Sequence, residues 1–188
     1  TGSTEHEPDV RTSGDRRTGT GTDVPVDLPE NTDRGEKIIH MNIRVMTIED
    51  FDQVHALWMS IIGFGIRSVD DSKEGIERFL KRNPTTSVVA EEDGKIVGAI
   101  LCGHDGRRGC LYHVCVDVNH RMRGIGKAMV VFTMEALKKE GINKVSLIAF
   151  TQNDIGNAFW NEIGWTKRED LNYYDFTLNE ANITAFIQ

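Results

Sequence analysis

Residues 116–127 read Val-Asp-Val-Asn-His-Arg-Met-Arg-Gly-Ile-Gly-Lys, and this stretch decides the fold. The apolar residues before it are typical of a β-strand, and a helical period of apolar residues starts at Ile125. Gly124 and Gly126 lie in the turn between them and let a ligand approach the backbone closely. The free amides of the first helical turn point at one place, together with the positive end of the helix dipole. The order of strand, glycine turn and helix therefore predicts an anion site that suits a diphosphate.

Three cations, Arg121, Arg123 and Lys127, surround this turn. The pattern is not the phosphate loop of nucleotide hydrolases, because no Gly-Lys-Ser/Thr follows it. It is not the dinucleotide-binding fingerprint either, because the first glycine of Gly-x-Gly-x-x-Gly is missing. The alternative interpretation is a glycine-rich turn with solvated arginines.

Hydrophobic periodicity and turn residues predict the other elements from residue 41 onward. A capping sequence at 47–50 is expected to open the first helix, and Asp70, Asp71 and Ser72 are candidate caps for the second. The expected elements are, in order, strand 42–46, a helix from 47, a helix to about 82, strands 87–91, 95–103 and 110–117, helix 124–140, strand 144–149, helix 153–163, strands 165–168 and 173–178, and a short helix over 180–187.

The connections between these elements determine how the strands pair. Three consecutive strands joined by short turns pair antiparallel, whereas the strand–helix–strand unit from Tyr112 to Ala149 implies a parallel crossover. We therefore expect an α/β (α+β) fold, with a mixed, mostly antiparallel central sheet flanked by helices. The residues expected to face inward are Ile125, Ala128, Met129, Phe132 and Ala136 on the long helix, and Ile155, Ala158, Phe159 and Ile163 on the last one.

Composition separates residues 1–40 from residues 41–188. The first forty residues contain no aromatic residue, three of the four prolines and seven threonines. Such a segment buries too little apolar surface to offset the entropy of ordering it. We expect a flexible tail or an expression-derived leader over 1–40, in which Val24, Val26 and Leu28 form an edge strand, and one domain over 41–188.

Charge and cysteine content narrow the class of protein. The 188 residues carry a formal net charge of −7, which disfavours nucleic acid as a partner. No apolar run approaches the ~18 residues of a membrane helix, and the first residues are too polar for a secretory signal. Three cysteines cannot all pair within one chain, so we expect reduced thiols and a cytoplasmic protein.

Two motifs together resemble the GNAT superfamily of N-acetyltransferases, in particular its small bacterial members. Arg121, Gly124 and Gly126 match the family's pyrophosphate pattern Gln/Arg-x-x-Gly-x-Gly/Ala. The later family pattern Asn-x-x-Ala-x-x-x-Tyr-x-x-x-Gly-Phe is matched at Asn153 and Gly164. It departs from the family at three positions, with Gly156 for Ala, Trp160 for Tyr and Trp165 for Phe. The expected element order over 41–178 agrees with the family fold.

The resemblance implies a place for acetyl-CoA, between the strand before the glycine turn and the strand that follows the long helix. Backbone groups of the strand pair with the pantetheine arm, the amides of the turn hold the pyrophosphate, and two residues of the second motif flank the pantetheine and the thiol. The implied coenzyme-binding residues are Val114, Cys115, Val116, Arg121, Met122, Arg123, Gly124, Ile125, Gly126, Lys127, Asn153 and Trp160.

The resemblance also implies direct transfer of acetyl from acetyl-CoA to a primary amine of an unidentified acceptor, either a small molecule or a protein. A strand amide would polarise the carbonyl and a base would deprotonate the ammonium. The family's usual acid is a tyrosine at position 160, and the indole of Trp160 cannot replace it. Tyr173, with Tyr174 as the alternative, is the expected substitute.

The general base has no family residue at its usual place, because residues 145–151 contain no acid. The candidates elsewhere are Glu91, Glu92, His113 and Asp117. We favour His113, which alternates with Cys115 and so faces the same side of the strand. The alternative is that His113 is an ordinary packed or surface histidine.

Acceptor specificity in the family comes from the first two helices and the last hairpin. Trp58, Phe64 and Arg67 are therefore expected on the acceptor side, although the position of Trp58 in an apolar stripe also fits a core residue. Two other functions stay open: a non-catalytic acetyl-CoA-binding regulatory module, and an enzyme that uses another acyl-CoA.

A metal site is not expected. The cysteines and histidines near the third and fourth predicted strands lack the Cys-x₂-Cys spacing of structural zinc sites; they are Cys102, His104, Cys110, His113 and Cys115. We expect acetyl-CoA and an amine acceptor as partners, no nucleic acid and no membrane. A homodimer stays open.

Overall fold

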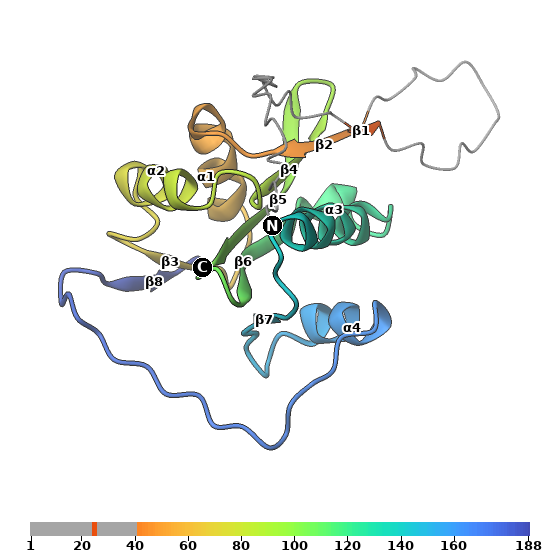
Figure 1. Ribbon diagram of the computed structural model, residues 1–188. Coiled ribbons are helices and arrows are strands. Elements are labelled where there is room, and N and C mark those ends of the chain that lie inside the picture. The colour runs from red at the N-terminus through yellow and green to blue at the C-terminus, as the bar shows by residue number, and fades with distance from the viewer. Residues whose placement is uncertain (1–23, 26–40) are drawn as a thin grey trace, which may run out of the picture.

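The computed structural model describes residues 24–25 and 41–188. A six-stranded sheet with the order β1-β2-β4-β5-β6-β7 runs through it (Figure 1). Neighbouring strands from β1 to β6 are antiparallel, and β6 and β7 are parallel, which confirms the expected fold class. The edge strand expected near Val24 is present as β1 (Val24–Pro25), while Val26 and Leu28 lie outside the described residues.

The elements follow the predicted order as far as the last helix, except for a short strand over Gly65–Arg67, between the first two helices, which the sequence did not predict. The strands are β2 (Met41–Val45), β3 (Gly65–Arg67), β4 (Val88–Glu92), β5 (Lys95–His104), β6 (Gly109–Val116), β7 (Val145–Leu147) and β8 (Thr184–Phe186). The helices are α1 (Phe51–Met59), α2 (Lys73–Arg82), α3 (Ile125–Lys139) and α4 (Asp154–Glu162), with 3₁₀ turns η1 (Ile48–Asp50) and η2 (Val118–His120).

Helices α1 and α2 cover one face of the sheet, and α3 covers the other (Figure 1). The buried stripe of α3 consists of Ile125, Met129, Val130, Thr133 and Leu137, so three predicted positions (Ala128, Phe132 and Ala136) are only half-buried. The reason is a close approach to β5, where a Cβ at Gly98 would lie 2.8 Å from the Met129 methyl group. That contact sets the rotation of α3 about its axis.

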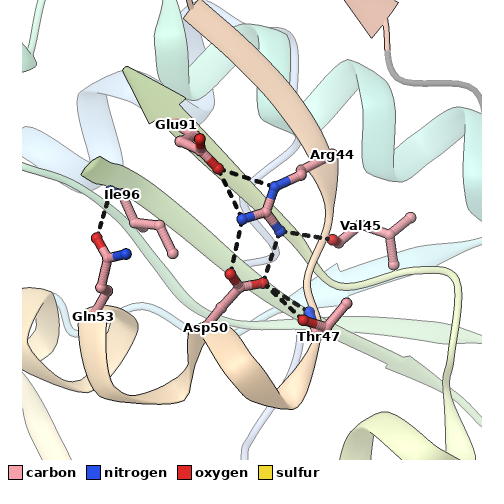
Figure 2. Close-up of polar contacts among 7 residues, drawn as sticks. All are labelled: Arg44, Val45, Thr47, Asp50, Gln53, Glu91 and Ile96. Atoms are coloured by element: carbon pink, nitrogen blue, oxygen red, sulfur yellow. Dashed lines mark hydrogen bonds and ion pairs between the residues drawn. The ribbon is translucent and has the colours of Figure 1, made fainter. Parts of the chain in front are cut away.

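Figure 2 shows how the start of α1 is attached to the sheet. The predicted capping box is present, with the Thr47 amide donating to Asp50 at 2.9 Å. Arg44 on β2 donates to Asp50 at 2.8 Å and to Glu91 on β4 at 2.8 Å. Burial opposes ionisation of Asp50, but the Arg44 hydrogen bonds outweigh it and lower the pKa of that carboxyl. These bonds fix the position of α1 against β2 and β4.

The chain after α4 does not follow the prediction. Residues 163–183 form no helix or strand, so the strands expected over 165–168 and 173–178 are absent from the described structure. The short helix expected over 180–187 is replaced by β8, which pairs antiparallel with β3. Figure 1 shows the segment between α4 and β8, residues 163–183, as a long extended arm. Residues of high β-propensity in this segment form no strand, because a strand needs a neighbouring strand edge to which its amides and carbonyls can bond.

The arm also changes the environment of α4. Phe159 and Ile163 pack against the core as expected, but Ile155 and Ala158 are exposed. Among the described residues, no strand pair covers the side of α4 that carries Ile155 and Ala158. Two of the four residues predicted to face inward on this helix are therefore exposed. Across residues 24–25 and 41–188, no helix has the length and apolar character that crossing a bilayer requires.

Candidate functional site

Strands β6 and β7 pair over three residues and then separate. The parallel register joins Gly109 to Val145 and Leu111 to Leu147, where β7 ends. Strand β6 continues to Val116 and pairs there only with β5 among the described residues. Its second edge therefore has no strand partner beyond Leu111 among the described residues, and this segment includes Val114–Val116, which the family resemblance implies for pantetheine.

This free edge leads directly to the glycine turn. Gly124 has a φ of +79° and precedes α3, whose N-terminus has no side-chain cap. The amides of Ile125, Gly126 and Lys127 have no backbone acceptor in the described part of the chain. Unpaired amides at the start of a 15-residue helix have the geometry that anions prefer. The structure thus contains the strand, turn and helix in the predicted arrangement.

Gly126 joins the two sequence motifs in space. A Cβ at this position would lie 3.3 Å from Cζ of Phe159 on α4 and 3.7 Å from a methyl group of Val116 on β6. The end of β6, the start of α3 and the side of α4 therefore meet at Gly126. Because glycine has no side chain, these three elements can pack this closely beside the unpaired amides.

The second motif has Gly156 where the family pattern has alanine. The Asn153 side chain leaves little space for a Cβ at this position. Oδ1 of Asn153 accepts a hydrogen bond from the Gly156 amide at 2.9 Å and caps α4. A Cβ at position 156 would lie 2.8 Å from Cγ of Asn153, closer than real atoms approach. Trp160 packs between Phe159 and Trp165, with ring centroids 4.9 and 5.0 Å away.

The cations of the turn are not equivalent. The guanidinium of Arg123 is paired with Glu92 on β4, so its charge is already compensated. Nε of Arg121 donates to the Val116 carbonyl at 3.2 Å, which holds its side chain beside the end of β6. Lys127 is exposed at the start of α3. Of the three predicted cations, Arg121 and Lys127 have charge to offer an anion, and Arg123 contributes its backbone.

Three of the four base candidates are engaged elsewhere. Glu91 pairs with Arg44, and Glu92 accepts from Arg123 and also lies 2.9 Å from Nε2 of His120. Asp117 lies 2.6 Å from Nδ1 of the same histidine. The Arg123 hydrogen bond lowers the pKa of Glu92, and the His120 hydrogen bond lowers the pKa of Asp117. These two carboxylates are therefore weak bases that hold the turn in place.

His113 is the remaining candidate, and it lies on a β-bulge. Three steps along β6, from Tyr112 to Cys115, oppose two steps along β5, from Leu101 to Ala99. His113 absorbs the extra residue with a φ of +48°, which is rare for a side chain with a Cβ. Bulges of this kind redirect side chains, and strained residues concentrate at functional sites.

The ring of His113 lies on the α1 face of the sheet, as its alternation with Cys115 predicts. Its centroid is 4.8 Å from that of Trp58 and 5.0 Å from that of Phe64. Nε2 lies 2.7 Å from Oδ1 of Asp71, at the start of α2. The sequence offered no signal for this partner, because Asp71 precedes His113 by 42 residues and resembles a helix cap. Ser72 is the actual cap, since its hydroxyl accepts from the Gly75 amide.

The other predicted site residues are placed differently. Trp58 is fully buried and belongs to the core beneath Phe64 and His113, so its alternative interpretation is correct. Phe64 is half-buried above it, and Arg67 is exposed on β3. Tyr173 is 68% exposed on the extended arm, where the structure gives it no hydrogen bond to the described residues.

Two of the three cysteines are core residues. Cys102 packs in the core on the α3 face and Cys115 in the core on the α1 face. Burial raises the pKa of each thiol to about 12, so both stay protonated at neutral pH. The part of the chain that the structure describes holds no group of three metal-ligating side chains.

Comparisons with known proteins agree with this geometry. The sequence profile of the acetyltransferase (GNAT) family matches residues 51–165. An acetyltransferase of Sodalis glossinidius is 31% identical over 131 residues, which cover 70% of this chain and 91% of that protein. An N-acetyltransferase of Thermoplasma acidophilum, solved with coenzyme A, is 19% identical with a TM-score of 0.59, covering 70% of this chain and 92% of that one.

A third similar protein is an aminoglycoside acetyltransferase solved with a coenzyme A bisubstrate analogue. It is 18% identical with a TM-score of 0.57, and the match covers 73% of this chain and 99% of that one. At this identity the likeness concerns the fold. The family profile covers more than half of the chain. The Sodalis relative is 31% identical over most of the length of both proteins. The chain therefore belongs to the GNAT family of acetyltransferases.

Proposed function

We propose that this acyltransferase is an N-acetyltransferase, which transfers acetyl from acetyl-CoA to a primary amine. One observation carries the proposal: the unpaired edge of β6 ends at the uncapped N-terminus of α3. An extended chain with phosphates at its end matches that arrangement of donors. Two of the structural neighbours were solved with coenzyme A or an analogue of it.

Different residues would bind the different parts of acetyl-CoA. Backbone groups of Val114, Cys115 and Val116 line the free edge of β6 for the pantetheine arm. The amides of the glycine turn and the charges of Arg121 and Lys127 hold the pyrophosphate, and Asn153 and Trp160 border the gap from α4. The whole proposed set is Val114, Cys115, Val116, Arg121, Met122, Arg123, Gly124, Ile125, Gly126, Lys127, Asn153 and Trp160. When bound, the coenzyme supplies an activated thioester.

The chemistry needs a proton acceptor near the acetyl carbon. His113 stands at the β6 bulge on the α1 face, and we assign it this role. Tyr173 remains the proposed proton donor to the leaving thiolate. Such a role requires the extended arm to bring its phenol toward β6, and the donor is not indispensable, because a thiol leaves readily as a thiolate.

The first test is acetyl-CoA binding to the full chain, by calorimetry and thermal unfolding. Free ligand at 100 times its Kd should stabilise the protein by about 2.7 kcal/mol. Gly126→Glu should abolish this, because a carboxylate beside the unpaired amides of α3 would repel phosphate. The matched control is Val131→Glu, which adds the same charge at an exposed position of α3. Absence of a shift at millimolar acetyl-CoA contradicts the proposal.

The second test is transfer. Thiol release is measured with acetyl-CoA and three classes of primary amine: an aminoglycoside, the polyamine spermidine and a peptide with an N-terminal alanine. Release that depends on one of these amines supports acetyl transfer. Binding of acetyl-CoA without release for any amine contradicts it and favours a coenzyme-binding module. Faster release with succinyl-CoA or propionyl-CoA than with acetyl-CoA would overturn the acetyl assignment.

A further inference from the structure

We infer that Asp71 is the positioning residue of the catalytic base: it holds His113 in the one tautomer whose Nδ1 accepts the proton of the acceptor amine. This role rests on the proposed function and belongs to a residue that neither motif contains. Its support comes from the hydrogen bonds of Asp71, the surroundings of the His113 ring and the chemistry of imidazole.

Asp71 is a buried carboxylate whose two oxygens have different partners. Oδ2 accepts a hydrogen bond from the Arg67 amide at 2.6 Å, and Oδ1 lies 2.7 Å from Nε2 of His113. The backbone of Asp71 is fixed as well, because its amide donates to the Arg67 carbonyl at 3.0 Å. The carboxylate therefore cannot turn away from the histidine without losing the bond to Arg67.

His113 is equally constrained. Its backbone is held at the bulge. Its ring packs against Trp58 on α1 and against Phe64 in the loop before β3. The side chain is 11% exposed, so the ring keeps a narrow opening to solvent. A carboxylate accepts hydrogen bonds and does not donate them, so Nε2 must carry the proton. Nδ1 then presents a lone pair.

Nδ1 is available for chemistry. The described part of the chain offers it no hydrogen-bond partner. Nδ1 is bonded to Cγ, so it lies nearer to the β6 backbone than Nε2 does. The arrangement is a carboxylate, an imidazole and a ring nitrogen without a partner among the described residues, in which the carboxylate orients the ring.

The group-transfer step balances with these groups. The amine nitrogen forms a bond to the acetyl carbon, and the carbon–sulfur bond breaks with its electron pair going to sulfur. The amine proton goes to Nδ1 of His113, which becomes an imidazolium beside Asp71. The thiolate takes up one proton, from Tyr173 or from solvent, and His113 gives its proton back to replace it, which leaves an amide, a thiol and neutral His113.

Asp71→Asn is a sharp test because the Arg67 amide decides how the new side chain sits. That amide only donates, so the asparagine oxygen must stay on its side. The NH₂ group then faces His113 and donates to Nε2, which forces the proton onto Nδ1. The substitution keeps size and shape but reverses the tautomer, and a carboxylate-to-amide change of this kind leaves geometry intact while it removes base catalysis.

The tautomer is measured by NMR on the full chain with ¹⁵N-labelled histidine, saturated with acetyl-CoA. The signals of His113 are assigned by their loss in His113→Gln. We expect the Nε2–H form in the wild type and the Nδ1–H form in Asp71→Asn. An Nδ1–H form in the wild type, or no change in the variant, overturns the inference. This readout needs no acceptor, so it decides the tautomer even if the proposed transfer fails.

The positioning role of Asp71 is tested by steady-state kinetics of thiol release, with the amine that gives the fastest release as acceptor. Asp71→Asn should lower kcat by about 100-fold or more, the ordinary contribution of a general base, while the Kd for acetyl-CoA changes less than about threefold. The same substitution in a His113→Gln background should add less than about twofold, since it acts through His113. Asp52→Asn, an exposed carboxylate on α1, is the matched control. An unchanged kcat in Asp71→Asn, or a full loss in both backgrounds, contradicts the positioning role.

Discussion

Asp70 and Asn182 are joined by two hydrogen bonds although 112 residues separate them. The Asp70 amide donates to Oδ1 of Asn182 at 3.1 Å, and Nδ2 of Asn182 donates to Oδ2 of Asp70 at 2.7 Å. The Val69 amide also donates to Oδ1, and β8 pairs with β3 next to it. The C-terminal residues thus brace the loop that carries Phe64 and Asp71 to the side of His113.

Removal of this brace should weaken both stability and catalysis. Asn182→Ala takes the partner from two backbone amides, and we expect it to lower the free energy of unfolding by about 1–2 kcal/mol. It should also lower kcat more than it raises the KM for acetyl-CoA, because Asp71 becomes less well held. Urea unfolding and thiol release measure the two effects. Gln188→Ala, whose side chain reaches only the Phe186 carbonyl at 3.4 Å, should behave as wild type. Equal stability of the two variants would refute the bracing role.

The three cations of the glycine turn should contribute unequally to coenzyme affinity. Arg121→Ala and Lys127→Ala should each raise the Kd for acetyl-CoA by roughly fivefold or more, the effect of a lost charge-assisted contact. Arg123→Ala should change the Kd less and lower the melting temperature instead, because its guanidinium is paired with Glu92. Calorimetry at low and high salt checks the order. A larger loss of affinity for Arg123→Ala than for Lys127→Ala would show that Arg123 leaves Glu92 when coenzyme binds.

Acid should weaken the anchor of the turn to β4. The Arg123 hydrogen bond lowers the pKa of Glu92 in the folded protein below its unfolded value of about 4.3. The stabilisation is therefore fully present above that value and is lost as the pH falls through the folded pKa. We expect Glu92→Gln to be less stable than wild type at pH 7 and the difference to shrink near pH 3, by urea unfolding. The exposed Glu162→Gln is the control. A difference that does not vary with pH would contradict this account.

The family alanine should not suit position 156 in this chain. Helix propensity favours alanine over glycine by about 1 kcal/mol, but its Cβ would displace the Asn153 cap, which is worth about the same. Gly156→Ala should therefore fail to stabilise the wild type. In an Asn153→Ala background, where the cap is already gone, the same change should stabilise by about 0.5–1 kcal/mol. A double-mutant cycle by chemical unfolding measures the coupling. Equal effects in both backgrounds would show that the cap and the glycine are independent.

The local features of the fold were predictable because they arise from neighbouring residues. The capping box at Thr47 and the glycine turn at Gly124 each depend on residues within one turn of helix. The meander of β4, β5 and β6 follows from alternation and short turns. The predictions failed where the partner was distant in sequence. The arm over 163–183 has strand-like residues, but whether they pair depends on an available edge.

In the candidate site, too, features set by neighbouring residues were predictable and features set by residues distant in sequence were not. The glycine turn and the candidate base His113 are visible in the chain itself, since residue type and spacing carry their chemistry. The partners that set the function of each side chain are not visible there. Glu92 neutralises Arg123, and Asp71 faces His113, only because the sheet and α2 bring together residues that lie 31 and 42 positions apart.

The sequence by itself determined the family, the order of elements through α4 except β3, and the glycine turn before α3, because these depend on local periodicity and on glycines that tolerate unusual backbone. Tertiary structure alone decided which carboxylates are engaged in ion pairs, which histidine nitrogen is free and where the C-terminal strand pairs. Hydrogen bonds and ion pairs act over about 3 Å, and only folding determines which groups from distant segments come within that distance.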